Sequence, residues 1–288
     1  MVVSFKAFSI SVAVCLIGIT STIYWDITAG TTTYTQQPTT QHPEPNPDST
    51  NATTTHTDRL DQIPQFTYLE ITNSCTIAIT DSCQYAHSAP YSTSPKRQAL
   101  RNGMVLLVDE TMTNEIGEQW HRIAFNEPLR YPERLQPPWY VKAEAGFTFA
   151  NVGIQEVSDS TPSTTKYILI ERNTQMLYAY DGDELFMATS TATGLVATPT
   201  PRGHFTVFKM TPTRYMQGPI PGITSQYYDL PGVPWNLYFT KQGAIVHGVY
   251  WHDTFGTPYS NGCVNLPTDL ARKLYDWAEL GMTLIVRD

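Results

Sequence analysis

The sequence has 288 residues, 41% of them hydrophobic, which is enough for one large domain or two small ones. Its 18 Lys and Arg residues against 26 Asp and Glu residues give a net charge of -8, an acidic balance that opposes the phosphate neutralisation on which nucleic-acid binding depends. Charged residues make up only 15% of the chain, a low share that favours an exported protein over a cytosolic one.

The N-terminal segment is apolar. Residues 7–25 carry no charge, with Lys6 before them and Asp26 after them. A helix of this length spans roughly 30 Å, the thickness of a bilayer core. Residues 1–25 are therefore predicted to form an uncleaved signal anchor, a transmembrane helix with Lys6 inside the cell and the rest of the chain outside. A cleaved signal peptide is the alternative, although its apolar region is normally shorter, about 7–15 residues.

Residues 26–60 are rich in Thr, Pro, Gln and Asn and contain almost no large apolar residue after Tyr34. Such a segment cannot bury a core, so it is predicted to be an extended linker.

Residues 61–155 contain short β-type runs, at 104–108, 120–125 and 139–149, separated by turn residues such as Asn102-Gly103. They predict a small all-β barrel. The segments YAHSAPYSTSP, LRNGMVLLV, EQWHRIAF and WYVKAE resemble the loop, turn and Trp-led strands of bacterial SH3-like domains. That resemblance implies binding to, or positioning on, the cell wall; a spacer with core Trp residues is the alternative.

Residues 164–288 are again rich in strands. Asp181-Gly182 lies between two alternating runs and predicts a hairpin, and GHFTVFKM, NLYFT, AIVHGV and MTLIVR predict further strands. One helix is predicted, with Thr268 as its N-cap and Gly281 at its end. Its apolar stripe consists of Leu270, Leu274 and Trp277. Apart from the anchor, the predicted fold class is mainly β with this one clear helix.

The four cysteines divide by position. Cys15 lies in the predicted anchor, whereas Cys75 and Cys83 are eight residues apart and could close a disulfide-bonded loop outside the cell. Cys263 is then left unpaired in a compartment where thiols oxidise, which points to a chemical role. The alternative is a buried cysteine that acts as a small hydrophobic residue.

The residues around Cys263 have the types that a thiol enzyme needs. A free cysteine is only a few per cent thiolate at neutral pH, so it needs a base, and His247 at the end of an apolar strand is the candidate. Gly248 keeps space open beside that imidazole. The small-residue turn of Ser260, Asn261, Gly262 and Cys263 could aim backbone N–H groups at one point, as an oxyanion hole requires.

These residues resemble the catalytic domain of the L,D-transpeptidases, the YkuD-like domain. The resemblance rests on His-Gly at 247–248, twelve intervening residues, then Ser-Asn-Gly-Cys at 260–263 followed by Val264 and Asn265, and on ATGLVATPTPRGHFTV upstream. It implies peptidoglycan cross-linking between third-position residues of stem peptides through a thioester on the cysteine.

The resemblance also implies site roles. Cys263 is the expected nucleophile, His247 the base, the Gly248 carbonyl its orienting partner, and the N–H groups of Gly262 and Cys263 the oxyanion donors. Asn261 stands where the family usually has His, and we expect it to prop the loop rather than to move protons.

The remaining candidates concern substrate binding. Ser260 and Asn265 are expected to shape the turn, with Asn265 also a candidate substrate contact. His252 could bind the donor stem with Tyr250 and Trp251 as a wall, and Tyr238 could line the acceptor channel. Arg202 or Arg214 could pair with stem carboxylates.

The predicted protein is a peptidoglycan L,D-transpeptidase of the cell envelope, held to the cytoplasmic membrane by its N-terminal helix, or secreted if that segment is cleaved. No metal, organic cofactor or nucleic acid is expected. The main alternative is a non-catalytic wall-binding protein with a degenerate transpeptidase domain. A zinc hydrolase lacks a helical His pair, papain-like peptidases have Cys before His, and the sortase Thr-Leu-x-Thr-Cys strand is absent from the sequence.

Overall fold

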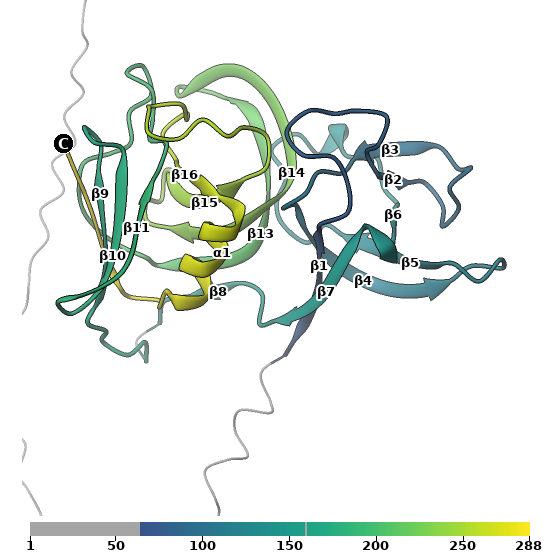
Figure 1. Ribbon diagram of the computed structural model, residues 1–288, viewed down its shortest axis with the longest axis horizontal. Helices are drawn as coiled ribbons and strands as arrows, with labels where there is room; N and C mark the ends of the chain where they lie inside the picture. The colour runs from purple at the N-terminus through teal and green to yellow at the C-terminus, as the bar shows by residue number, and fades with distance from the viewer. Residues whose placement is uncertain (1–63, 159) are drawn as a thin grey trace, which may run out of the picture. The chain divides into compact units, whose positions relative to one another are not determined.

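The computed structural model describes residues 64–158 and 160–288. The predicted anchor at 1–25 and linker at 26–60 lie outside the described residues. No helix among those residues is long and apolar enough to cross a membrane. The described part of the chain is mainly β with one α-helix, as predicted, and its strands form three sheets (Figure 1).

The first sheet has seven antiparallel strands in the order β3-β2-β6-β5-β4-β1-β7. Short 3-10 turns precede β6 (Pro132–Arg134) and follow it (Ala143–Ala145). The strands are β1 (Phe66–Ile71), β2 (Tyr85–His87), β3 (Lys96–Ala99), β4 (Val105–Thr113), β5 (Gln119–Ala124), β6 (Trp139–Lys142) and β7 (Gly146–Asn151).

Strand β4 explains why residues 104–108 form an unbroken apolar run. Successive side chains of a strand point to opposite faces. Val105 and Leu107 enter a core shared with the C-terminal region, whereas Leu106 and Val108 enter a second core beneath the seven-stranded sheet. The strand is therefore buried on both faces, and the two β regions are packed together rather than separated.

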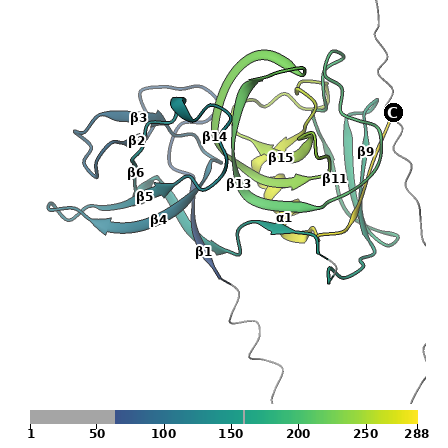
Figure 2. The ribbon, with the colours of Figure 1, turned by 180° about the vertical axis from the view of Figure 1, so that it is seen from behind.

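The C-terminal region contains two five-stranded sheets, ordered β11-β10-β9-β17-β12 and β16-β15-β14-β13-β8. Figures 1 and 2 show β13 and β14 as one long curved hairpin. The strands are β8 (Gln155–Glu156), β9 (Lys166–Glu171), β10 (Met176–Asp181), β11 (Glu184–Ser190), β12 (Gly203–Thr206), β13 (Lys209–Ile220), β14 (Thr224–Tyr238), β15 (Ile245–Val249), β16 (Val264–Pro267) and β17 (Thr283–Arg287).

Two predicted strand features have different outcomes. The Asp181-Gly182 hairpin is confirmed, because β10 and β11 pair up to Asp181 opposite Glu184, and Gly182 has a positive φ that the tight turn requires. The segment GHFTVFKM is not one strand. It divides into β12, which pairs with β17, and the start of β13, which pairs with β14, so the chain changes sheets at residues 207–208.

The helix α1 spans Thr268–Trp277, and its predicted ends were wrong. Thr268 is the first helical residue; Pro267 occupies the N-cap position, where its fixed φ suits a helix start and no side chain caps. The helix ends before Ala278, short of Gly281. The buried positions are Ala271, Leu274 and Tyr275, because α1 packs against β14, β15 and β16 on that side.

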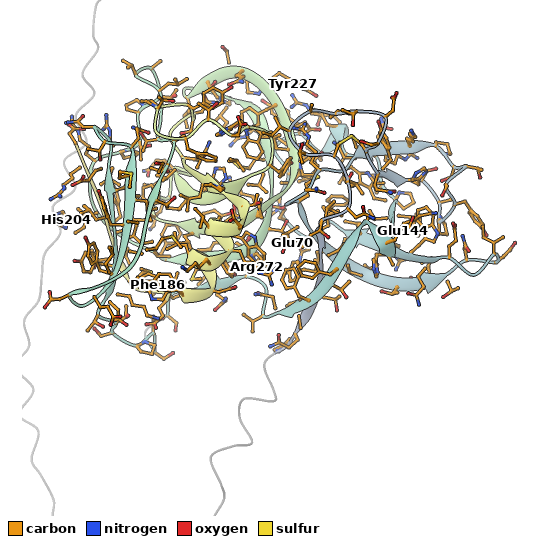
Figure 3. The ribbon with its side chains drawn as sticks, viewed as in Figure 1. Glu70, Glu144, Phe186, His204, Tyr227 and Arg272 are labelled. Atoms are coloured by element: carbon orange, nitrogen blue, oxygen red, sulfur yellow. A yellow bond between two sulfur atoms is a disulfide. The ribbon has the colours of Figure 1, made fainter. Side chains whose placement is uncertain are left out.

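Side-chain contacts join the seven-stranded sheet to the C-terminal region. Arg272 of α1 donates to Glu70 of β1 at 2.6 Å (Figure 3). Its guanidinium also lies over the ring of Trp235. The loop before β6 also contacts the β13–β14 hairpin: Tyr131 Oη donates to Pro219 O at 2.8 Å and Arg134 donates to Gly218 O at 2.6 Å. The first β region therefore holds the turn end of this hairpin.

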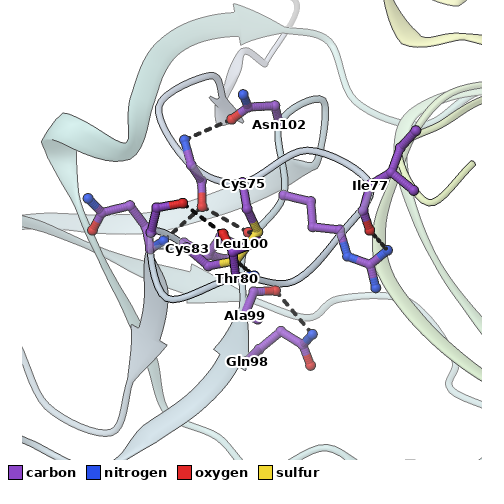
Figure 4. The surroundings of a disulfide bond; sticks show 12 residues. Cys75, Ile77, Thr80, Cys83, Gln98, Ala99, Leu100 and Asn102 are labelled. Carbon is purple, nitrogen blue, oxygen red and sulfur yellow. Dashed lines mark hydrogen bonds between the residues drawn. A yellow bond between two sulfur atoms is a disulfide. The ribbon is translucent and has the colours of Figure 1, made fainter.

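Cys75 and Cys83 form a disulfide bond (Figure 4). Asn102 fixes the start of the loop that it closes, because its backbone N–H donates to Cys75 O and its side-chain oxygen accepts from Ser74 N–H, both at 2.8 Å. Within the described residues, Cys263 is the free cysteine.

Candidate active site

The site lies on two neighbouring parallel strands, β15 and β16. Val246 pairs with Val264 and His247 with Asn265. Val246 and Val264 face the core, so alternation places His247 and Asn265 on the opposite face. Cys263 immediately precedes β16 and by the same alternation shares that face. Parallel pairing thus brings a thiol and an imidazole sixteen residues apart onto one side of one sheet.

His247 is fully buried in the middle of β15, not at its end as predicted. Its Nδ1 lies 2.9 Å from Gly248 O. Because a carbonyl oxygen only accepts, Nδ1 carries the proton and Nε2 is left as the acceptor. The Trp251 ring stacks on the imidazole at 5.8 Å between centroids. Burial lowers the pKa of His247 to about 4, so the ring is a neutral base at pH 7.

Cys263 is only partly exposed, and burial raises the pKa of its thiol. The Ile245 backbone N–H and the positive charge of Arg214 act in the opposite direction. Sγ also donates a long hydrogen bond to Gly243 O, at 3.8 Å. Burial of both groups favours a neutral thiol beside a neutral imidazole over a thiolate–imidazolium pair. Proton transfer to His247 must therefore accompany attack.

The turn before the thiol is fixed by its own hydrogen bonds. Ser260 Oγ accepts from Gly262 N–H at 3.1 Å and donates to Cys263 O at 2.5 Å. Gly262 has a φ of 109°, which a residue with a Cβ adopts only under strain. Leu195 N–H donates to Ser260 O at 2.9 Å, so the upstream segment that includes Thr200 supports the turn. The Gly262 N–H expected to hold an oxyanion is engaged by Ser260 in this structure.

The other predicted substrate-binding residues differ in how deeply they are buried. Tyr250 is buried in the core, and its hydroxyl donates to Pro231 O at 2.6 Å. His252 is also buried, with Nε2 2.9 Å from the Asn265 amide. These contacts give His252 and Asn265 a structural partner in each other. Trp251 remains partly exposed beside His247.

The two candidate arginines differ in their surroundings. Arg202 is exposed and forms an ion pair with Asp288, at the end of the chain. Arg214 lies over the ring of Tyr238, 5.3 Å from its centroid, on the hairpin beside the thiol. Tyr238 is partly buried there. The structure therefore gathers Arg214 and Tyr238 with Cys263 and leaves Arg202 elsewhere.

Residues 165–286, which include both strands of the site, match the family model of the YkuD L,D-transpeptidase catalytic domain. The chain contains an L,D-transpeptidase catalytic domain. An N-terminal β region precedes it, and no curated protein sequence matches the chain.

Solved L,D-transpeptidases are among the similar structures. One from Mycobacterium smegmatis is 21% identical and has a TM-score of 0.41, with 59% of this chain and 91% of that chain covered. One described as LdtMt1 in complex with imipenem is 18% identical, with the same TM-score and coverage. The catalytic domain from E. faecium is 21% identical with a TM-score of 0.38, covering 43% of this chain and 98% of that one.

Two residues of this L,D-transpeptidase domain were missed by the sequence reasoning. Gln226 accepts a hydrogen bond from Asn261 Nδ2 at 3.1 Å, which ties the turn before Cys263 to β14. Burial raises the pKa of Tyr228 to about 12, and the charge of Cys263 adds to this effect, so Tyr228 also lies near the thiol. Both lie in the hairpin segment 221–230, whose sequence gives no local sign that the hairpin curves back to the site.

Metal binding has no candidate cluster in the described ranges. Among residues 64–158 and 160–288, no group of three or more His, Cys, Asp or Glu side chains could hold a metal ion.

Proposed function

We propose that this chain is a peptidoglycan L,D-transpeptidase that forms 3-3 cross-links between stem peptides through a thioester on Cys263. The observation that supports it most is the placement of Cys263 and His247 on one face of neighbouring parallel strands, inside the segment that matches the family model. The family acts in the cell envelope on peptidoglycan, which is consistent with the disulfide between Cys75 and Cys83.

In the first half-reaction, Sγ of Cys263 attacks the carbonyl carbon that precedes the terminal D-alanine of a donor stem. The thiol proton passes to Nε2 of His247, which is free because Nδ1–H is held by Gly248 O. When the tetrahedral intermediate collapses, the C–N bond breaks and His247 returns the proton to the leaving amine. The products are D-alanine and a thioester on Cys263.

In the second half-reaction, the side-chain amine of the third residue of another stem attacks the thioester. His247 takes a proton from that amine and gives it to the departing sulfur, so the enzyme returns to its starting state. The Cys263 N–H stabilises the oxyanion in both halves, joined by Gly262 N–H when it leaves Ser260 Oγ. Asn261 positions the turn through Gln226 and moves no proton.

The rest of the chain positions this chemistry. We assign residues 1–25 to a membrane anchor, 26–60 to the linker, 61–155 to an SH3-like domain that contacts the wall, and 164–288 to the catalytic domain. Contacts from Tyr131 and Arg134 to the β13–β14 hairpin support a role for the first β region in holding the substrate-binding side of the site.

The test is mass spectrometry of a chain beginning at residue 55, incubated with a carbapenem and, separately, with tetrapeptide stem dimers. We expect one acyl adduct on the wild type and 3-3 linked products. Both are lost in Cys263→Ala and His247→Gln but kept in His204→Gln, which changes an exposed histidine. Cross-linking that persists in Cys263→Ala excludes the mechanism, and a wild type that forms neither adduct nor product supports the non-catalytic wall-binding alternative.

A further inference from the structure

The guanidinium of Arg214 is buried at one end without a partner. Its Nη1 is inaccessible to solvent and makes no hydrogen bond to any described residue. No carboxylate lies within 4 Å of it in the described part of the chain, whereas Arg172, Arg202, Arg272 and Arg287 of the same region all have acidic partners. Arg214 is only partly buried and its guanidinium contacts Tyr238, but a buried N–H without an acceptor is costly. Nη1 therefore calls for an acceptor, and an anion also suits the charge of the group.

The contact of this guanidinium with Tyr238 places it near the thiol. Tyr238 of β14 pairs with Ile245 of β15, and Cys263 comes directly before the residue that pairs with Val246. Tyr238, Ile245 and Cys263 are therefore neighbours along one row of the sheet. Arg214 reaches from β13 over the Tyr238 ring, at 5.3 Å from its centroid, and so lies beside this row.

Glu127, whose charge interacts with that of Arg214, does not pair with it. Its carboxylate accepts a hydrogen bond from Tyr215 N–H, and no ion pair within 4 Å joins it to Arg214. Burial raises the pKa of Glu127 to about 7, so this carboxyl group is partly protonated near neutral pH. The positive charge of Arg214 acts on Glu127 and also on the thiol: it lowers the pKa of both groups, in each case against the larger effect of burial.

We propose that Arg214 binds the terminal carboxylate of the donor stem and thereby selects stems that end one residue after the attacked carbonyl. This inference rests on the proposed function. In a peptide that ends in D-alanine, the carboxylate carbon is three bonds from the attacked carbon, hence within about 4 Å of it. When the attacked carbonyl lies next to Sγ of Cys263, the terminal carboxylate is therefore within reach of the Arg214 guanidinium. One additional residue moves the carboxylate away by up to about 3.6 Å.

Binding by Arg214 also gives the carboxylate a planar pair of donors, which fixes the orientation of the scissile bond as well as its charge. Arg214 is a substrate-binding residue in this scheme and moves no proton. A neutral C-terminus leaves its Nη1 buried and unpaired, so such a donor is disfavoured.

The first experiment needs no transpeptidase activity. Alkylation rates of Cys263 are measured with iodoacetate and with neutral iodoacetamide, in the wild type and in Arg214→Gln, Arg214→Lys and Arg202→Gln. We expect the iodoacetate-to-iodoacetamide rate ratio to fall about 10-fold or more in Arg214→Gln, to fall less in Arg214→Lys, and to stay unchanged in Arg202→Gln. An unchanged ratio in Arg214→Gln, with its thermal unfolding still cooperative, overturns the proposal.

The second experiment compares a tetrapeptide donor that has a free carboxylate with the same donor as its C-terminal amide. Wild type is expected to favour the acid in kcat/KM by about 10–100-fold, and Arg214→Gln to lose that preference while still processing the amide. Equal loss on both donors overturns the carboxylate assignment and leaves the proposed function standing. No turnover of either donor, with the alkylation ratio still dependent on Arg214, refutes the proposed function and keeps the anion site.

Discussion

The free energy of unfolding at decreasing pH tests whether burial keeps His247 neutral. Its pKa is about 4 in the folded protein and 6.5 in an ordinary environment, because burial penalises the imidazolium. Between pH 6.5 and pH 4, His247 is therefore protonated in the unfolded chain but remains neutral in the folded chain. The contribution of His247 to stability is complete above pH 6.5 and decreases as the pH falls to 4. At pH 4 the cost is about 3 kcal/mol.

Glu127 changes the stability in the opposite direction as the pH falls. Measurements on the wild type alone would therefore not reveal the contribution of His247. The pKa of Glu127 is about 7 in the folded protein against 4.5 ordinarily, again because of burial. The folded state binds this proton more tightly, so Glu127 contributes stability that is complete below pH 4.5 and is lost as the pH rises through 7. Between pH 7 and 4 it adds about 3 kcal/mol, which nearly cancels the His247 effect.

The assay is urea unfolding followed by tryptophan fluorescence at pH 7, 5.5 and 4 for wild type, His247→Gln and Glu127→Gln. The free energy of unfolding of His247→Gln should increase relative to wild type by about 3 kcal/mol from pH 7 to pH 4. That of Glu127→Gln should decrease relative to wild type by a similar amount. A His247→Gln difference that stays constant with pH would show that His247 is not held neutral by burial, and the reasoning on its role as a base fails with it.

Two substitutions test the packing around the site. Gly248→Ala should destabilise the protein by about 1–3 kcal/mol, because an added Cβ would lie 3.0 Å from Pro234 and press on α1. Thermal unfolding measures this loss of stability, and an unchanged unfolding midpoint contradicts the prediction. Arg272→Met should cost about 1–3 kcal/mol, since the partly buried Glu70 is left without its partner. Lys273→Met, on the exposed side of α1, should cost less than about 0.5 kcal/mol. Equal effects of the two helix substitutions would show that the Glu70 contact adds nothing.

Local sequence patterns predicted several of the strands and the helix correctly. The Asp181-Gly182 turn and the alternating runs on either side of it predicted a hairpin, because the signal lies within a few residues. The helix was found by its periodicity, but its ends were not. Its N-terminus lacks a side-chain cap, and its buried side is set by the sheet that it packs against. The strand break at residues 207–208 depends on pairing with segments far along the chain, which no local pattern reports.

The sequence by itself determined which chemical groups are present and in what order: a thiol after a small-residue turn, an imidazole before glycine, and enough spacing to place them on adjacent strands. Only the tertiary structure decided which of the remaining polar residues accompany them. Arg202 and Arg214 are equivalent candidates in the sequence. In the structure Arg202 pairs with Asp288, whereas Arg214 lies over Tyr238, in the row of residues that includes Cys263. The reason is that strand order and register, not distance along the chain, decide which side chains share a face of a sheet.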